Sequence, residues 1–230
     1  MNHKRGFAAA IMVVALAGAG SAPSAQAGQV GFYIGGQYGQ GSRESRIQDF
    51  DVYAQQQYDG FRFAVDSGTS SLDDSDSGYG FFAGYRFTPH LAVEGGYLNL
   101  GSLTYRSRVN GSAQGVPSAG AFNLDSETAG IAVSGLGVWP LSYRWEVYGR
   151  GGVLFASNTA SLFYADDVIG PARGEFSENS IDALVGIGTS FNFLEIYDFR
   201  LEYQRVFDAG DESTGEGDLD MISVGITVLF

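Results

Sequence analysis

The chain alternates between apolar and polar residues over much of its length. The last segment shows this most clearly, because Ile222, Val224, Ile226, Val228 and Phe230 place large apolar side chains at every second position. A period of two is typical of a β-strand with one apolar face. The same pattern predicts eight strands, at residues 30–40, 78–87, 91–101, 127–139, 145–156, 180–193, 199–207 and 219–230.

The segments between these predicted strands alternate in length. Short connections are expected at 88–90, 140–144 and 194–198, and long ones at 41–77, 102–126, 157–179 and 208–218. Short turns on one side and long loops on the other are typical of antiparallel outer-membrane barrels, in which the short turns are periplasmic. The sequence therefore predicts an all-β fold: an eight-stranded antiparallel up-and-down transmembrane β-barrel with short periplasmic turns and long extracellular loops.

Aromatic residues gather at both ends of the predicted strands. The periplasmic ends are expected to hold Phe32, Phe87, Trp139, Trp145, Phe193, Phe199 and Phe230. The opposite ends are expected to hold Tyr38, Tyr79, Tyr97, Phe155, Tyr203 and Phe207. Two such girdles are typical of a barrel that crosses both interfaces of a bilayer.

The first 27 residues have the pattern of a cleaved secretory signal peptide. A basic start precedes an apolar run from Phe7 to Gly20, and Ala25-Gln26-Ala27 supplies small residues for cleavage. We therefore expect a signal peptide at 1–27 and a single outer-membrane β-barrel domain at 28–230. The chain has no cysteine, which excludes a lipid-anchored cysteine and a disulfide framework.

The charge of the chain excludes one class of partner. Loss of Lys4 and Arg5 with the signal peptide would lower the net charge from −13 to −15. Such an acidic chain has no basic surface for phosphates, so we expect no nucleic acid as a partner. Of the 26 acidic residues, 18 fall in the four predicted long loops, where solvated, mutually repelling carboxylates are the first expectation and divalent cations a minority one.

The polar face of the predicted strands should line the barrel interior. Its ionic members are Arg86, Glu94, Glu146, Arg150, Asp182, Arg200 and Glu202, with Gln204 beside them. An eight-stranded barrel is just wide enough to be filled by side chains. Opposite charges in so narrow a space must pair or bear a large desolvation cost, so we expect an ion-pair network in the lumen. A narrow conduction path is the alternative.

Two positions leave the strand pattern open. Arg205 has lipid-facing parity, and we expect it at the outer rim, where its stem could reach lipid phosphates, or else turned inward by a bulge. In the fourth predicted strand, Ile131 and Val133 on one face and Leu136 and Val138 on the other are all apolar. Parity alone therefore does not orient this strand.

Several segments resemble the OmpA-like outer-membrane β-barrel family. Residues 30–39 (VGFYIGGQYG) resemble its first strand, and 80–87 (GFFAGYRF) followed by 91–97 (LAVEGGY) resemble its second and third strands. The resemblance implies paired lumen charges at Arg86, Glu94, Arg150 and Glu202. It also implies that Phe230 is a carboxy-terminal signal read by the barrel-assembly machinery. Full-length family members continue into a peptidoglycan-binding domain, which this chain lacks, so cell-wall anchoring is not expected.

The sequence offers little support for catalysis. Some small barrels are enzymes, but a serine nucleophile needs a base, and the single histidine after residue 27, His90, falls in a predicted periplasmic turn. We expect no enzyme activity, no cofactor and no metal site. The predicted function is a structural and surface-interaction role through acidic extracellular loops, in a monomer surrounded by outer-membrane lipid and lipopolysaccharide. A narrow channel for small solutes is the alternative, and a lipid-modifying enzyme the third possibility.

Overall fold

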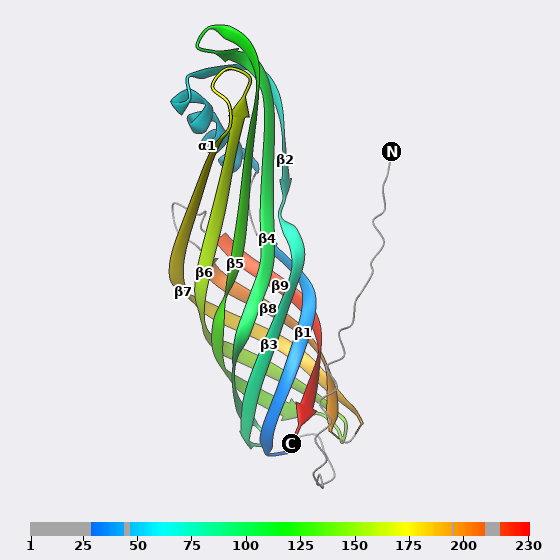
Figure 1. Ribbon diagram of the computed structural model, residues 1–230. Helices are drawn as coiled ribbons and strands as arrows, with labels where there is room; N and C mark the ends of the chain where they lie inside the picture. Colours follow the sequence, from blue (N-terminus) through cyan, green and yellow to red (C-terminus); the bar gives the residue numbers. More distant parts are fainter. Residues whose placement is uncertain (1–28, 44–46, 195, 210–216) are drawn as a thin grey trace, which may run out of the picture.

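The computed structural model describes residues 29–43, 47–194, 196–209 and 217–230, without the side chain of residue 208. The predicted signal peptide lies outside these residues. The chain forms one helix and nine strands (Figure 1): β1 (Gly31–Arg43), α1 (Ile47–Gly60), β2 (Phe63–Asp73), β3 (Ser75–Thr88), β4 (Leu91–Ala113), β5 (Val116–Pro140), β6 (Trp145–Asp166), β7 (Ala172–Leu194), β8 (Tyr197–Ala209) and β9 (Gly217–Leu229).

Eight of these strands close into an antiparallel ring. Each pairs with its neighbours in the order β1, β3, β4, β5, β6, β7, β8 and β9, and β9 returns to β1. Within the closed ring each strand is paired on both sides, which is what a sheet needs in order to stand in lipid. The predicted eight-stranded up-and-down barrel is confirmed, and its eight strands contain the predicted ones almost entirely.

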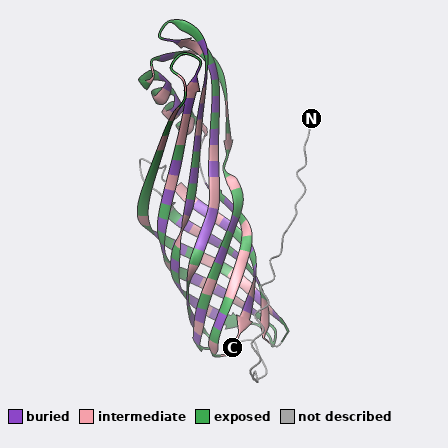
Figure 2. Ribbon diagram, viewed as in Figure 1, coloured by how far each residue is buried: buried purple, intermediate pink, exposed green. Residues whose placement is uncertain are grey.

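The ring has the inside-out polarity of a membrane barrel. On β9, Ile222 and Val224 are exposed, whereas Ser223 and Thr227 are buried in the lumen. The orientation of β5 is now settled: Ile131 and Val133 face outward, and the even-numbered residues face inward. Figure 2 shows buried and exposed residues alternating along the strands. Among the described residues, no helix is long and apolar enough to cross a membrane.

The predicted long loops at 41–77, 102–126 and 157–179 are instead mostly regular structure. Strands β4 to β7 run for 22 to 25 residues, far beyond the length needed to cross a bilayer. Their outer halves and β2 form a five-stranded sheet in the order β2-β4-β5-β6-β7, which rises from one side of the ring (Figure 1). We call this part, residues 47–73, 102–127 and 157–180, the extension.

The outward face marks where the lipid-facing band ends. On β4 the outward residues are apolar up to Tyr97 and then become Ser102, Thr104, Arg106 and Arg108. The same change falls between Ile131 and Glu127 on β5, between Phe155 and Ser157 on β6, and between Ile181 and Asn179 on β7. The extension therefore lies entirely beyond the apolar band.

A bulge at Gly101 allows β4 to serve both parts. The pairing with β5 shifts by one residue between Asn99 and Ser102, and Gly101 has a φ of +91°, a value that favours glycine. Before the bulge the even-numbered residues of β4, such as Leu98, face inward. After it the odd-numbered residues, such as Tyr105, face inward.

Helix α1 covers the inner face of the extension. Its apolar residues recur at helical spacing, with Ala54 and Tyr58 buried, and Asp49 lies in its first turn, where a negative charge favours the helix N-terminus. The helix ends at Gly60, and Arg62 then takes a left-handed φ of 57° that turns the chain into β2. Above the apolar band, a helix thus takes the place of the missing half of the barrel wall.

Candidate functional site

The lumen contains an ionic layer built from four strands, β3, β4, β6 and β8. Arg86 on β3 forms two hydrogen bonds to Glu146 on β6, of 2.7 and 3.0 Å. Glu94 on β4 accepts hydrogen bonds from both Arg150 on β6 and Arg200 on β8, the latter at 2.8 Å. All six side chains of the layer are at most 10% exposed: Arg86, Glu94, Glu146, Arg150, Arg200 and Glu202.

Glu202 on β8 completes the layer. Its carboxylate lies 2.7 Å from Nε of Arg150, so Arg150 is held between Glu94 and Glu202. Three arginines therefore face three glutamates in this layer, and the charges balance. Buried ion pairs gain stability over unpaired charges only when the charges are also hydrogen-bonded, and each member of this set has a hydrogen bond to an opposite charge.

Two tyrosines fix the glutamates from opposite sides. The hydroxyl of Tyr33 donates to Glu94 and that of Tyr148 donates to Glu202, both at 2.9 Å. The guanidinium of Arg200 lies over the rings of Phe82 and Tyr148, 4.9 and 4.8 Å from their centroids. A cation over an aromatic face gains further stabilisation where water is excluded. Tyr33, Phe82 and Tyr148 share the inward parity of the charged residues, and this parity is the signal that could have placed them in the lumen.

Each tyrosine lies over a cross-strand glycine. Tyr33 is paired with Gly84, and Tyr148 with Gly188. A Cβ added at Gly84 would lie 2.3 Å from the Tyr33 ring, and one at Gly188 would lie 2.4 Å from the Tyr148 ring. These two glycines supply the space that the tyrosine rings need in order to reach the glutamates.

We expect Gly188→Ala to lower the free energy of unfolding by about 1–3 kcal/mol, because the methyl group forces the buried Tyr148 ring away from Glu202. Urea unfolding of the purified barrel in detergent measures the change. Gly151→Ala is the control, since a Cβ there meets nothing within 4 Å. Equal effects of the two substitutions would contradict the proposed packing role.

An apolar layer lies in the lumen between the ionic layer and the extension. It consists of Leu98, Leu100, Ala132, Leu154, Ala156, Leu184, Val206, Ala209, Leu219 and Met221, all buried. Leu154, Val206, Ala209 and Met221 have no exposed area at all. A contiguous apolar cluster of this kind excludes water and ions from the barrel axis at this level.

Asp182 belongs to a second polar layer rather than to the ionic one. Its carboxylate accepts a hydrogen bond of 2.9 Å from Ser180, which also accepts from Asn158 at 3.1 Å. The chain continues through Thr128 to the buried guanidinium of Arg43, 2.9 Å from the Thr128 hydroxyl. Arg43 was missed because the first strand was predicted to end at residue 40, although the inward parity of Tyr33 continues to it.

The core of the extension is the most aromatic cluster of the structure's described residues. It contains Ala54, Tyr58, Phe63, Tyr105, Val109, Ala113, Phe122, Leu124, Ala160 and Tyr164, contributed by α1, β2, β4, β5 and β6. The ring of Tyr58 on α1 is 5.6 Å from that of Phe63 and 5.9 Å from that of Tyr164. The residues above the apolar band are therefore organised as in a water-soluble domain, with apolar side chains inside and polar ones outside.

Carboxylates tie this core together. The Tyr105 hydroxyl donates to Asp51 of α1 at 2.6 Å, and burial, together with this bond, raises the pKa of Tyr105. Burial alone would raise the pKa of Asp166, but hydrogen bonds from the Tyr164 hydroxyl and from the backbone of Val168 and Ile169 outweigh it and lower that pKa. Near neutral pH, Tyr105 therefore stays protonated and Asp166 stays charged.

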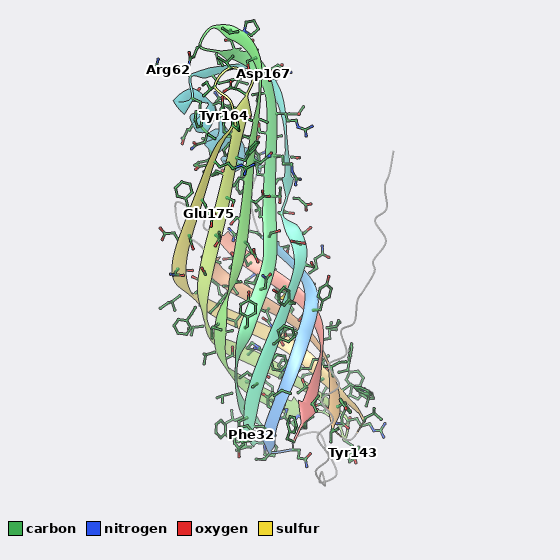
Figure 3. The ribbon with its side chains drawn as sticks, in the orientation of Figure 1. Phe32, Arg62, Tyr143, Tyr164, Asp167 and Glu175 are labelled. Carbon is green, nitrogen blue, oxygen red and sulfur yellow. The ribbon has the colours of Figure 1, made fainter. Side chains whose placement is uncertain are left out.

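The tips of the extension are also joined. The backbone N–H of Asp167, in the turn after β6, donates to the Ser118 hydroxyl on β5 at 3.2 Å. Tyr164, Asp167 and Arg62 all lie near the distal end of the extension (Figure 3). The β4–β5 hairpin and the β6–β7 hairpin therefore form one ordered unit.

Arg205 does face outward at the rim, but its guanidinium is already occupied. Two of its nitrogens lie 2.7 Å from the carboxylate oxygens of Asp220 on β9, and a third lies 3.4 Å from Asp218. The Tyr203 hydroxyl donates to the same Asp220 at 2.6 Å. Outward parity was expected, whereas this pairing was not. No bulge turns Arg205 inward, since its pairing with Asp220 and Val185 is regular.

The other predicted residues lie at the opposite end of the barrel. Phe230 is exposed, and its N–H donates to the Phe32 carbonyl at 2.9 Å, next to the β1–β9 seam. His90 lies in the turn between β3 and β4, with Nδ1 3.1 Å from the Val138 carbonyl oxygen. Within the described ranges, no group of three or more histidine or acidic residues is arranged to hold a metal. The assembly role of Phe230 stays a prediction.

A closed antiparallel ring with lipid-facing apolar residues and a charged lumen defines an outer-membrane β-barrel. The profile of the OmpA-like transmembrane domain matches residues 27–230, and the chain belongs to this family. Outer membrane protein A of Serratia marcescens is 25% identical over 95% of this chain and 55% of its own length. That of Yersinia pseudotuberculosis is 28% identical over 66% of this chain and 40% of its own. The chain spans about half the length of the curated relatives it matches.

Solved structures of outer-membrane proteins align with most of the chain. Neisserial surface protein A is 17% identical, with a TM-score of 0.47, over 89% of this chain and 99% of its own. OprG of Pseudomonas aeruginosa is 12% identical, with a TM-score of 0.46, over 90% of this chain and 99% of its own. Membership of the OmpA-like family places the protein in the bacterial outer membrane, as the sequence predicted.

Proposed function

We propose that this protein is a structural outer-membrane barrel whose extension interacts with molecules outside the cell. The main supporting observation is an ordered aromatic core that lies wholly beyond the lipid-facing band. Building such a core requires about 1–2 kcal/mol of backbone entropy for each ordered residue. A barrel that only anchors itself in the membrane has no need for it.

The lumen does not favour the channel alternative. The charge-balanced ionic layer and the apolar layer above it are stacked along the same axis. An ion on this path would have to break buried ion pairs and then cross an apolar layer. We also propose no enzymatic role, since His90 is occupied in a turn at the end of the barrel away from the extension.

Lipopolysaccharide is the proposed neighbour of the outer rim. Arg205 is neutralised by Asp218 and Asp220, so it is a poor candidate for binding lipid phosphate. Arg106 and Arg108 are better placed, because they face outward on the part of β4 that extends beyond the apolar band, and the described residues offer neither an ion pair. Both could bind phosphate groups as charged donors.

The proposed function predicts that the extension is needed for surface interaction and not for assembly. We would replace residues 47–73, 103–126 and 158–179 by short turns and express this trimmed barrel in a Gram-negative host. At equal surface levels, only cells with the intact protein should adhere to extracellular proteins or to each other. Both forms should show the heat-dependent gel shift of a folded barrel.

Two outcomes would overturn this proposal. Adhesion that is equal for trimmed and intact barrels, or absent from both, would remove the role of the extension. Steady single-channel openings of the intact protein in planar bilayers would show that the lumen conducts ions and is not purely structural.

A further inference from the structure

One edge of the extension is an unpaired strand. β7 pairs with β6 from Ala172 to Phe191, but with β8 only from Leu184 onward. Residues 172–183 therefore have hydrogen-bonded partners on one side alone among the residues that the structure describes. Backbone N–H and C=O groups along such an edge are free to pair with a further strand. Glu175 marks this free margin in Figure 3.

The opposite edge of the same sheet is protected at the start of β2. β2 is interrupted by a bulge between Val65 and Ser67, and its first residue, Phe63, is buried under α1. Bulges and covering elements are common means of blocking edge-to-edge pairing. β7 has neither over this length, because its register with β6 is continuous from Ala172 to Ser180.

The side chains of this part of β7 are open on both faces. Residues 175–179 are all exposed, and Phe176 on the inner face is 52% exposed, although it is paired with Ala160 of the aromatic core. Glu175 on the outer face and Glu178 on the inner face have no ion pair within the described part of the chain. The edge thus presents one aromatic and two unpaired carboxylates.

We propose that residues 172–180 bind an extended, positively charged polypeptide segment as a sixth strand of the extension. The inference rests on the proposed surface role and names its partner class. Residues directly opposite in an antiparallel pair share a face, so each carboxylate needs a cation across from it and Phe176 needs an apolar residue. The segment would therefore read, in its own direction, cation, any residue, apolar residue, cation, facing residues 178, 177, 176 and 175.

A second copy of this chain does not fit the edge. Two barrels in one membrane point the same way, so their β7 strands would run parallel and could not form the antiparallel pair. Self-pairing would also bring Glu175 and Glu178 close to their own copies, and like charges facing each other destabilise a strand pair. Charge complementarity instead favours a basic segment from another protein.

The test uses the intact protein in nanodiscs and a fluorescent eight-residue peptide with Lys-Thr-Val-Lys at its centre. Anisotropy measures binding, and hydrogen exchange with mass spectrometry locates it. We expect slower exchange at 172–180 and binding about tenfold weaker in the Glu175→Lys/Glu178→Lys variant, since two exposed ion pairs are lost. A peptide with Glu in place of both Lys should restore binding to that variant.

Matched controls separate strand pairing from simple charge attraction. Asp66→Lys/Asp73→Lys makes the same charge change at the β2 edge and should leave binding unchanged. A peptide N-methylated at alternate residues keeps its charges but loses the edge hydrogen bonds, and should not bind. Exchange protection elsewhere, binding of the methylated peptide, or no binding at all would overturn the inference. Adhesion lost on trimming but unaffected by charge reversal would refute this inference and leave the proposed function standing.

Discussion

Glu94→Ala is expected to lower the free energy of unfolding by about 3–5 kcal/mol, because it leaves buried charges without their partner. Arg150 and Arg200 both bind the Glu94 carboxylate, and Tyr33 donates to it as well. Removal of this one residue changes the layer from balanced to an excess of one positive charge, in a place that water cannot easily reach. Urea unfolding of the barrel in lipid vesicles, followed by tryptophan fluorescence, measures the loss.

Glu178→Gln is the matched control for this experiment. Glu178 is an exposed acidic residue outside the lumen, and its neutralisation should change stability by less than about 0.5 kcal/mol. If Glu94→Ala also changed the free energy of unfolding by less than about 0.5 kcal/mol, the ionic layer would not stabilise the barrel. Tyr33→Phe should give a smaller loss, since it removes one hydrogen bond and leaves the ion pairs in place.

The barrel itself could be predicted from the sequence because its two faces differ so strongly. In lipid, outward residues must be apolar and a filled lumen can be polar, so a period of two identifies the strands and orients them. Arg86, Glu94, Glu146, Arg150, Arg200 and Glu202 were expected in the lumen, and all six lie there. Which cation meets which carboxylate depends on register and on stagger around the ring, which one chain does not reveal.

The extension was missed because its polarity is reversed. Beyond the apolar band, water replaces lipid outside and an aromatic core replaces the ionic lumen, so the apolar residues of each strand change from the outer to the inner face. Phe122 and Leu124 still alternate with polar residues, but with the opposite sense from Ile131 and Val133 on the same strand. In β4 the bulge at Gly101 also shifts the alternation by one residue, so the strand does not look continuous in the sequence. The many serines and aspartates of β2 gave that strand the composition of a loop.

The barrel and the extension should therefore unfold separately, and Tyr58→Ala tests this. The Tyr58 ring is almost fully buried between Phe63, Phe122 and Tyr164, and it is the main side chain that joins α1 to the sheet. Loss of a buried aromatic ring costs about 3–5 kcal/mol. Because α1 is held only by this core, we expect it to detach, with fast hydrogen exchange across residues 47–60.

The barrel should survive the same substitution. The ionic and apolar layers of the lumen make no use of α1, so the heat-dependent gel shift and the urea midpoint of the ring should stay as in the unchanged protein. Val52→Ala is the control, since Val52 lies on the same helix with 60% of its surface exposed, and its exchange should remain slow. If Tyr58→Ala instead unfolded ring and extension in one transition, the extension would be an integral part of the barrel's stability and could not act as a separate surface domain.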